Sequence, residues 1–430
     1  MAQYLYRIAD GLLKEKLEAF GAVLIEGPKW CGKTTTAVQQ AASVLQMQDP
    51  DNRESYLVTA ETKPSLLLKG DNPRLIDEWQ IAPVLWDSVR VEVDRRNETG
   101  QFILTGSNSF DHTKVMHSGT GRIARMKMYP MSLWESGESN GKISLSKLFD
   151  NHNYDIDGIK SDLSIEQLIF AACRGGFPAT LNLKTDKARL QVSDEYLNSV
   201  CETDVIAVDG VQRNPELTKL ILKSYARNIC TLSKKSSLLK DVQASFENLS
   251  IKTFDDYVNA LQKIFVIQDV TAWNPPIRSA TVIRSGHKRN FADPSIVVAA
   301  LGIKYQQLLL DLKTFGFIFE SLAIRDLKAY SIGIGGNLSF YNDRYGLEAD
   351  VVLHLSDGRY ALIEVKLGSQ QIEEGAKHLL ELRRLVQEYN KREQQIRLRE
   401  PDLLIVITCG QMAYTRNDGV KIVPIGCLKQ

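Results

Sequence analysis

The first third of the chain alternates short apolar runs with amphipathic stretches. Apolar and charged residues recur at helical spacing over residues 4–20, and an apolar run at 22–25 is typical of a buried strand. The stretch from Thr35 onward has the pattern of the helix that would follow this strand. Further apolar runs predict strands at 55–58, 74–78 and 101–108. Strands that alternate with helices in this way indicate an α/β fold with a parallel sheet.

The middle of the chain, residues 185–300, has mostly helical patterns. Amphipathic stretches at 217–230, 237–246 and 253–263 precede two short apolar runs at 265–267 and 281–283. Three helices followed by two strands are typical of a winged helix-turn-helix, with Thr253 as N-cap of the third helix. In that arrangement a basic tip formed by Arg284, Lys288 and Arg289 favours contacts with phosphates. A helical linker with a solvated hairpin fits the same pattern equally well.

The order of elements changes again near residue 313. Helical spacing over 315–329 precedes three strand patterns at 338–341, 348–355 and 359–365. The last two strands are joined by Ser356-Asp357-Gly358, which is a hairpin turn signal. A long amphipathic stretch at 371–392 and an apolar run at 402–408 complete the predicted order of helix, three strands, helix and strand.

A chain of 430 residues is too long for one ordinary core, and its patterns divide it into three predicted domains. These are a nucleotide domain at 1–184, a helical, winged-helix-like domain at 185–312 and a second α/β domain at 313–430. A hydrophobic content of 43% and a charged content of 24% are those of a soluble globular protein. Because the net charge is only +1, any basic surface for a nucleic acid must be local.

Cysteine usage and hydropathy predict a cytoplasmic protein. Six cysteines are scattered without paired spacing, which argues against both a disulfide framework and a zinc site. No apolar run approaches the length of a membrane span, and the N-terminal segment has no signal-peptide core. We therefore expect no membrane partner.

The most specific motif is GPKWCGKT at residues 27–34, which fits the phosphate-loop pattern between a strand and a helix. Backbone N–H groups converge at such a turn and form an anion site. Lys33 is expected to reach the β- and γ-phosphates of ATP, and the Thr34 hydroxyl to join the shell of Mg²⁺. The predicted nucleotide-binding residues here are Gly27, Pro28, Lys29, Trp30, Cys31, Gly32, Lys33, Thr34 and Thr35.

The strand pattern at 74–78 ends in two carboxylates, as expected of the partner of a phosphate loop. We predict that Asp77 holds Mg²⁺ and that Glu78 polarises the water that attacks the γ-phosphate. A surface acidic pair is the alternative. Ser107, with Thr105 and Asn108 beside it, ends the next predicted strand and is expected to lie near the γ-phosphate. A role in the turn alone is the alternative.

Arg122 is the candidate for neutralising charge on the transferred phosphoryl group, either in cis or from a neighbouring subunit. The second possibility would require a homo-oligomer. An ordinary salt bridge at the surface is the alternative role.

Together the phosphate loop, LIDEWQ, FILTGSNS, GRIARMKMYPMSLWE and GGFP resemble a family of prokaryotic AAA+-type ATPases. In that family the ATPase is joined to a C-terminal domain of unknown function. The resemblance implies a P-loop NTPase core of the additional-strand type, with Lys33, Thr34, Asp77 and Glu78 carrying the nucleotide chemistry.

Three polar residues on the predicted C-terminal strands are placed so that their side chains can converge. Glu364 and Lys366 are two apart and face the same side of their strand, and Asp350 lies across the ladder. Asp350 and Glu364 are predicted to share a hard cation such as Mg²⁺. Lys366 would then orient or activate a water for attack on a phosphodiester, with Glu320 behind the ligands or as an additional ligand.

The order of elements and these residues resemble the PD-(D/E)XK nuclease superfamily, in which they match the aspartate, glutamate and lysine. Ala349 stands where the motif expects proline. The resemblance implies a nuclease-like C-terminal fold that can be retained without the chemistry.

These features predict an ATPase that acts on nucleic acid, with DNA favoured over RNA, through a nuclease-like domain. The alternatives are a regulatory ATP switch that binds DNA or protein without cleavage, and a protein-remodelling ATPase. Basic residues at 383, 384, 391, 392, 397 and 399 form either a DNA path or a solvated charged face.

Overall fold

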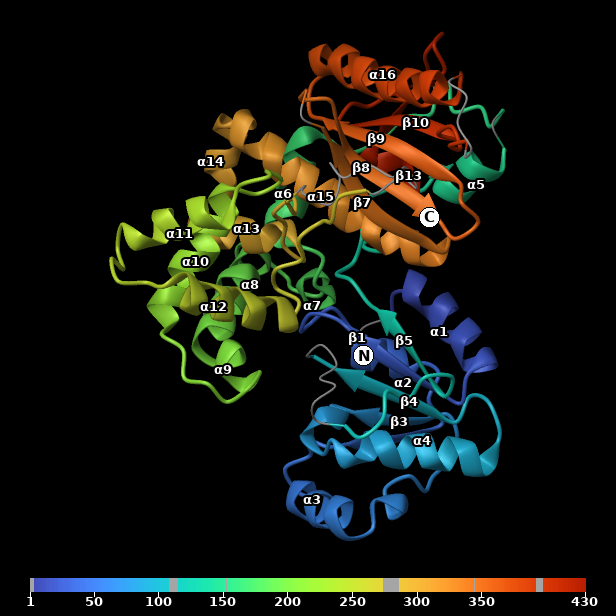
Figure 1. The fold of residues 1–430 in the computed structure, drawn as a ribbon, viewed down its shortest axis with the longest axis vertical. Helices are drawn as coiled ribbons and strands as arrows, with labels where there is room; N and C mark the ends of the chain where they lie inside the picture. The colour runs from blue at the N-terminus through green and yellow to red at the C-terminus, as the bar shows by residue number, and fades with distance from the viewer. Residues whose placement is uncertain (1–3, 108–114, 152, 274–285, 344, 392–396) are drawn as a thin grey trace. The chain divides into compact units, whose positions relative to one another are not determined.

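The computed structural model describes residues 4–430 except 108–114, 152, 274–285, 344 and 392–396 (Figure 1). Its contacts divide the chain into two compact units. The first comprises Tyr6–Pro130 with Lys263–Phe265, and the second comprises mainly Met131–Gln262 and Val266–Gln430. The predicted division into 1–184, 185–312 and 313–430 is finer than these units and stays a prediction.

The first unit is a five-stranded sheet in which every pairing is parallel. Its strands lie in the order β2-β3-β4-β1-β5. One strand, β4, is therefore inserted between β1, which precedes the phosphate loop, and β3, which ends in Asp77. This is the parallel core of a P-loop NTPase of the additional-strand type, as the sequence predicts. The elements are α1 (Ile8–Ala19), β1 (Ala22–Glu26), α2 (Lys33–Val38), β2 (Ser43–Gln46), α3 (Arg53–Thr62), β3 (Arg74–Asp77), α4 (Val84–Arg96), β4 (Phe102–Gly106) and β5 (Ile123–Lys127).

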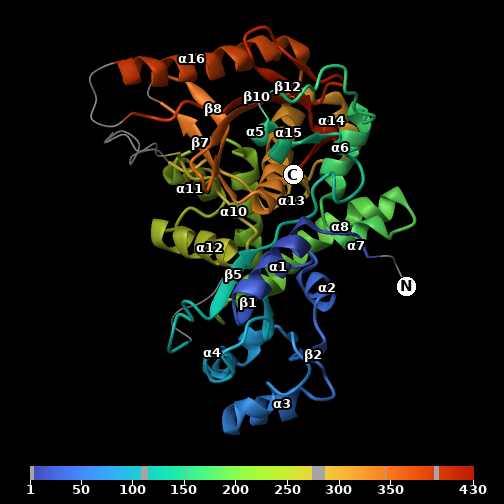
Figure 2. The same ribbon diagram turned by 90° about the vertical axis from the view of Figure 1, so that its right-hand side faces the viewer.

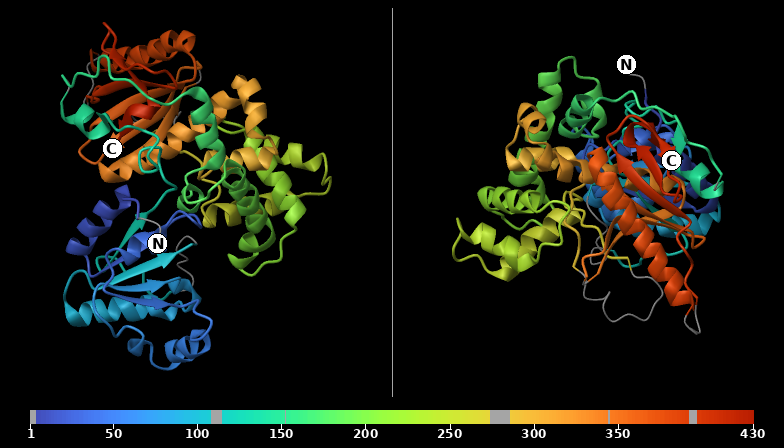
Figure 3. Two further views of the ribbon diagram at one scale, coloured as in Figure 1. Left: turned by 180° about the vertical axis from the view of Figure 1, so that it is seen from behind. Right: turned by 90° about the horizontal axis from the view of Figure 1, so that it is seen from above.

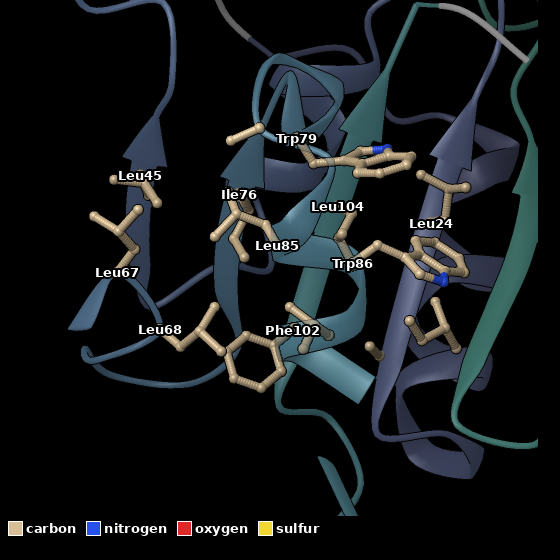
Figure 4. Close-up of a cluster of buried hydrophobic side chains, with 14 of the residues drawn as sticks. Leu24, Leu45, Leu67, Leu68, Ile76, Trp79, Leu85, Trp86, Phe102 and Leu104 are labelled. Atoms are coloured by element: carbon tan, nitrogen blue, oxygen red, sulfur yellow. The ribbon is translucent and has the colours of Figure 1, made fainter. Parts of the chain in front are cut away.

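Helix α4 covers one face of this sheet and closes its hydrophobic core (Figure 4). Leu24, Ile76 and Leu104 project from three neighbouring strands toward it. Trp86 of α4 is fully buried among them, and its ring centroid lies 5.2 Å from that of Trp79. Because Trp79 directly follows the 77–78 carboxylates, this packing fixes the chain just after the acidic pair.

The predicted strand at 55–58 is wrong, because these residues lie in helix α3. Val58 is 60% exposed, while Ala60 is buried and Tyr56 and Leu57 pack partly against the core. One apolar face at helical spacing thus outweighs a short apolar run. The second strand of the sheet is instead β2, at its edge, where only Leu45 is buried and the polar neighbours obscured the pattern.

The second unit contains a series of helices, of which α6, α8 and α10 pack against α13, and α6 and α14 pack against α15. The sequence predicts phosphate contacts by Arg284, Lys288 and Arg289 in this unit, and Arg284 lies outside the described residues. The helices are α5 (Leu145–Asp150), α6 (Ile165–Arg174), α7 (Pro178–Leu181), α8 (Asp186–Ser199), α9 (Val205–Ala207), α10 (Pro215–Arg227), α11 (Lys235–Gln243), α12 (Ile251–Lys263), α13 (Pro294–Leu301), α14 (Tyr305–Leu310) and α15 (Leu312–Gly333). Helices α10, α11 and α12 follow one another along the chain as the sequence predicts, and Figure 2 shows them as neighbours.

Two details differ from the winged-helix expectation. Helix α12 starts at Ile251, and the Ser250 hydroxyl accepts a hydrogen bond from Thr253 N, so Ser250 caps it rather than Thr253. The paired segments after α12 are joined by bridges between Ile267 and Phe291 and between Val270 and Lys288. The winged helix-turn-helix itself stays a prediction.

A mixed six-stranded sheet completes the second unit, with strand order β11-β12-β10-β9-β8-β7. Strands β7, β8 and β9 are antiparallel neighbours, and β10 runs parallel to β9. Helix α16 (Ile372–Lys391) lies along one face, where Leu379 and Leu382 enter the core (Figure 3). The strands are β7 (Gly336–Asn342), β8 (Glu348–Leu355), β9 (Tyr360–Lys366), β10 (Leu403–Thr408), β11 (Tyr414–Thr415) and β12 (Lys421–Pro424), while β13 (Leu428–Lys429) pairs separately with β6 (Ile143–Ser144). The predicted order from α15 to β10 is confirmed.

The MSLWE and GGFP motifs meet at a buried charge network around Arg325. This guanidinium lies 2.7 Å from Asp326 and 3.2 Å from Asp293, with all three side chains almost fully buried. Asp326 accepts a hydrogen bond from Leu133 N, and Asp293 accepts one from Gly176 N. The two motifs therefore supply backbone donors that satisfy buried carboxylates, which gives them a structural role.

We expect Arg325→Met to lower the free energy of unfolding by about 3–5 kcal/mol, because it leaves two buried carboxylates without their counter-charge. Urea unfolding followed by circular dichroism measures this loss. The matched control is Arg227→Met, which breaks a largely exposed pair with Asp241 and should cost less than about 1 kcal/mol. Equal losses in the two variants would contradict the role of the network.

Candidate functional site

The phosphate loop connects β1 to α2 and depends on two glycines. A Cβ on Gly27 would lie 2.2 Å from the Met128 carbonyl oxygen, so only glycine fits there. Gly32 has a φ of 100°, a left-handed conformation that favours glycine, and precedes the first residue of α2. The helix N-terminus thus opens directly at Lys33, and its free N–H groups provide an anion site.

Within the loop, the Lys33 ammonium group donates hydrogen bonds to the carbonyl oxygens of Gly27, at 2.9 Å, and Pro28, at 2.8 Å. Its side chain is therefore folded over the turn in which a phosphate would lie. Cys31 is buried beneath the loop, and its sulfur approaches the Met128 carbonyl oxygen at 3.9 Å. This packing gives Cys31 a place in the wall of the loop.

The predicted acidic partner lies directly against the loop. The Thr34 hydroxyl donates a hydrogen bond of 2.7 Å to Asp77 Oδ1, and the Thr105 hydroxyl donates one of 2.5 Å to the same oxygen. Asp77 and Thr105 lie at the carboxyl ends of β3 and β4, and Thr34 follows the loop that leaves the carboxyl end of β1. The parallel strand order brings them together at one edge of the sheet.

Glu78 lies next to this contact in a left-handed conformation, with φ 55°. Its carboxylate accepts a hydrogen bond of 3.0 Å from the Ser107 hydroxyl and another from the Gln80 amide. The structure therefore brings together Asp77, Glu78 and Ser107, all three of which the sequence singles out. Asn108, the neighbouring candidate, lies outside the described residues.

Arg7 is a residue of this site that the sequence analysis missed. Its side chain is buried, and its guanidinium donates hydrogen bonds to the carbonyl oxygens of Cys31, at 2.7 Å, and Tyr129, at 2.9 Å. Arg7 thus ties the middle of the phosphate loop to the segment that follows β5. A single basic residue before a helix gives no signal of this long-range contact in the sequence.

The structure contradicts a cis role for Arg122. The register pairs Ala22 with Ile123 and Glu26 with Lys127, so Arg122 precedes β5 at the amino edge of the sheet, opposite the phosphate loop. Four residues of strand separate the two edges by roughly 13 Å. Arg122 instead forms an exposed ion pair of 2.7 Å with Asp94. A role toward a neighbouring subunit stays a prediction.

The second candidate site lies on β8 and β9. The register pairs Val351 with Ile363, which brings Asp350 beside Glu364, and Asp350 Oδ2 accepts a hydrogen bond of 3.0 Å from Val365 N. Lys366 Nζ lies 2.8 Å from Glu364 Oε2, although this oxygen receives no hydrogen bond of good geometry. Asp350, Glu364 and Lys366 therefore converge as the sequence predicts.

Two predicted phosphate contacts, Lys288 and Arg289, are wrong. Both are only 5% exposed. Arg289 forms an ion pair of 2.7 Å with Asp269, and Lys288 Nζ lies 2.6 Å from Glu320 and 3.1 Å from Asp350. Since both cations are neutralised inside the unit, they are not available to bind a nucleic acid.

Burial and the neighbouring charges together set the protonation of this second cluster. Burial and the charge of Asp350 raise the pKa of Glu320 to about 8, against the opposing effect of Lys288. Burial alone would raise the pKa of Asp350, but Lys288 and Lys366 lower it below its ordinary value. Burial and Asp350 raise the pKa of Glu364, although His378 and Lys366 act in the opposite direction. Lys288, Lys366 or both therefore lower the pKa of each of these three carboxylates and oppose the effect of burial.

No group of three or more His, Cys, Asp or Glu side chains is placed to hold a metal ion in the part of the chain that the structure describes. At the cluster on β8 and β9, the cation beside Asp350 is the ammonium group of Lys288. The residues present therefore do not fit the metal that the nuclease resemblance implies.

Two of the basic residues of α16 and the segment after it, Arg384 and Arg399, form ion pairs with acids. Arg384 lies 2.6 Å from Glu381 and also contacts Glu388, and Arg399 lies 2.6 Å from Asp402. Arg392 lies outside the described residues. This pairing favours the solvated charged face over a DNA path.

Three family models match successive parts of the chain. Residues 19–136 match an AAA domain, residues 165–307 match a domain of unknown function (DUF8612), and residues 315–428 match another domain of unknown function (DUF4143). The AAA match covers the phosphate loop, Asp77 and Glu78. With the additional-strand sheet and the contact between the loop and Asp77, it identifies an AAA-type ATPase.

The chain is therefore an ATP-binding protein with ATPase activity of the AAA type. It is similar to uncharacterized proteins of Mycobacterium tuberculosis and Mycobacterium bovis, each 23% identical over 84% of this chain and 73% of the relative. Among the described residues, no helix is long and apolar enough to cross a membrane.

Comparison with solved structures gives a Walker-type ATPase of Pyrococcus abyssi, 12% identical, covering 69% of this chain and 96% of that one with a TM-score of 0.40. A signal transduction ATPase with numerous domains from Pyrococcus horikoshii is 13% identical, covering 78% of this chain and 48% of that one with a TM-score of 0.25. Scores of this size do not establish a common arrangement.

We expect Arg7→Met to raise the Kd for ATP by about tenfold, because two hydrogen bonds from a charged donor hold the loop that must receive the phosphates. Calorimetric titration with a non-hydrolysable ATP analogue measures this change. Arg53→Met, on the exposed start of α3, is the matched control and should leave the Kd unchanged. An unchanged Kd for Arg7→Met would show that the loop holds its shape without this contact.

Proposed function

We propose that the first unit performs Mg²⁺-dependent hydrolysis of ATP through Lys33, Thr34, Asp77 and Glu78. The observation that carries this proposal is the hydrogen bond of 2.7 Å between Thr34 and Asp77. A hydroxyl and a carboxylate at this spacing are the oxygen donors that Mg²⁺ prefers beside nucleotide phosphates. When bound, Mg²⁺ would offset the negative charge of the phosphates.

Lys33 would bind the β- and γ-phosphates in exchange for its bonds to Gly27 and Pro28. The carbonyl oxygens that now hold its ammonium group keep the side chain above the loop, which limits the entropy lost on binding. The N–H groups at the start of α2 would supply the remaining phosphate contacts.

Glu78 would orient and polarise the attacking water. The hydrogen bonds from Ser107 and Gln80 fix the direction of its carboxylate, and the left-handed backbone at Glu78 turns the chain there. Ser107 links this carboxylate to the end of β4, so we propose that it reports whether the γ-phosphate is present.

For the second unit we propose a regulatory role, in which the C-terminal sheet binds DNA or a protein partner without cleaving it. The observation that favours this role over a nuclease is the ion pair of Lys288 with Asp350. Cleavage by Asp350, Glu364 and Lys366 is the second candidate, favoured by the convergence of those three residues on β8 and β9. A cytoplasmic location and a homo-oligomer belong to the same proposal.

We expect Lys33→Ala to weaken ATP binding by about a hundredfold, because it removes a charged donor to the phosphates. Calorimetry with ATP measures the Kd. Unchanged binding would refute the assignment of the phosphate loop.

Glu78→Gln should retain ATP binding but lower kcat by about 10²–10⁴-fold, since the amide cannot accept a proton from water. Phosphate release under saturating ATP and Mg²⁺ measures turnover. Glu61→Gln, on the exposed face of α3, is the control and should turn over normally. Normal turnover in Glu78→Gln would assign the water-polarising role to another residue.

We expect double-stranded DNA to stimulate ATP hydrolysis while remaining intact in the presence of Mg²⁺ or Mn²⁺. Gel analysis of labelled DNA, run beside the ATPase assay, measures both properties. Metal-dependent cleavage that is lost in Lys366→Ala and kept in Lys33→Ala would replace the regulatory role by the nuclease candidate.

A further inference from the structure

Lys288 is held in place by its backbone before its side chain makes any contact. Its N–H donates to the Val270 carbonyl oxygen at 3.0 Å, and its own carbonyl oxygen accepts from Val270 N at 2.9 Å. Two residues further on, the Asn290 carbonyl oxygen accepts from Gln268 N at 2.9 Å. This antiparallel pairing fixes the backbone at Lys288 and therefore the direction in which its side chain projects.

The ammonium group of Lys288 lies among three oxygens. They are Glu320 Oε1 at 2.6 Å, Asp350 Oδ1 at 3.1 Å and the Asp350 carbonyl oxygen at 3.3 Å. An ammonium group has three protons, so this set can satisfy all of them. The Phe340 ring centroid lies 5.8 Å away and adds a favourable interaction with the cation.

The surroundings exclude most of the solvent. The side chains of Lys288, Glu320 and Asp350 are 7%, 13% and 8% exposed, and that of Glu364 is fully buried. Buried carboxylates so close together need a cation, since their mutual repulsion is not screened by water. Lys288 supplies that charge on the Asp350 side, and Lys366 supplies it on the Glu364 side.

We propose that Lys288 is the resident cation of the Glu320–Asp350 pair, where its ammonium group takes the position that a divalent ion would need. The cluster accordingly binds Mn²⁺ or Mg²⁺ only when Lys288 is removed or withdrawn. This proposal is independent of ATP hydrolysis in the first unit, and it supplies a physical reason for a C-terminal sheet that does not cleave.

The contact also joins two parts of the chain that match different family models. Lys288 lies within residues 165–307, whereas Glu320 and Asp350 lie within residues 315–428. Withdrawal of Lys288 would require the pairing of Val270 with Lys288 to shift. A partner that moved this segment would therefore uncover the carboxylates, and metal binding would report that movement.

The test is Mn²⁺ binding by the full-length chain without nucleotide, measured by electron paramagnetic resonance of free Mn²⁺. We compare the native chain, Lys288→Met, Asp350→Asn and the double variant. Methionine keeps most of the volume of lysine but removes its charge, so the carboxylates keep their shape and lose their counter-ion.

We expect Lys288→Met to gain one Mn²⁺ site at least about a hundredfold tighter than any in the native chain, because it removes a unit charge a few ångströms from the ion. The gain should disappear in the double variant, and Asp350→Asn alone should not change binding. Lys366→Met is the matched control, because it removes the cation paired with Glu364 but leaves Lys288 between Glu320 and Asp350, so no Mn²⁺ site should appear.

Two results would overturn the proposal. One is a Mn²⁺ site in the native chain that is lost in Asp350→Asn, which would show that metal binds despite Lys288. The other is a folded Lys288→Met, with native circular dichroism, that gains no site. Should Lys288→Met fail to fold, Lys288→Gln provides the same comparison, and the loss or retention of binding in Asp350→Asn still decides the first case.

Discussion

The hydrogen bond between the Thr34 hydroxyl and the Asp77 carboxylate is the contact on which the nucleotide site depends. It exists because β4 is inserted between β1 and β3, so that three parallel strands end at the same edge of the sheet. A shift of one residue in any pairing would turn these side chains to the other face. The buried packing of Trp79 and Trp86 behind the acidic pair resists such a shift. The same strand register therefore determines both the geometry of the nucleotide site and the packing of the core behind it.

The second unit depends on several ion pairs that are buried in its interior. Arg325 with Asp293 and Asp326, Arg289 with Asp269, and Lys288 with Glu320 and Asp350 all occupy its interior. Each buried ion would be costly by itself and is tolerated because its partner and backbone donors surround it. Loss of one partner from such a pair would leave an uncompensated buried charge. The ion pairs also mean that these basic residues stabilise the interior rather than attract a nucleic acid.

These two kinds of site differ in how accessible their charged groups are. In the first unit the polar groups are positioned around a turn that opens at a helix N-terminus, so an anion can enter. In the second unit the corresponding carboxylates already have cations of their own chain beside them. Lysine and carboxylate side chains therefore lie around the phosphate loop in the first unit, and in the second unit they form buried ion pairs with one another.

Local sequence determined the parts of this protein whose signal is short-range. The GPKWCGKT turn, the acidic end of β3, and the order from α15 to β10 all follow from patterns within a few residues. Tertiary structure decided the rest. An edge strand with one buried side chain, Leu45, gives too weak a hydrophobic pattern to be recognised, and the apolar run at 55–58 belongs to the helix at Arg53–Thr62. Arg7 and Lys288 are single basic residues whose partners lie far along the chain, and only the folded backbone brings charge and counter-charge together.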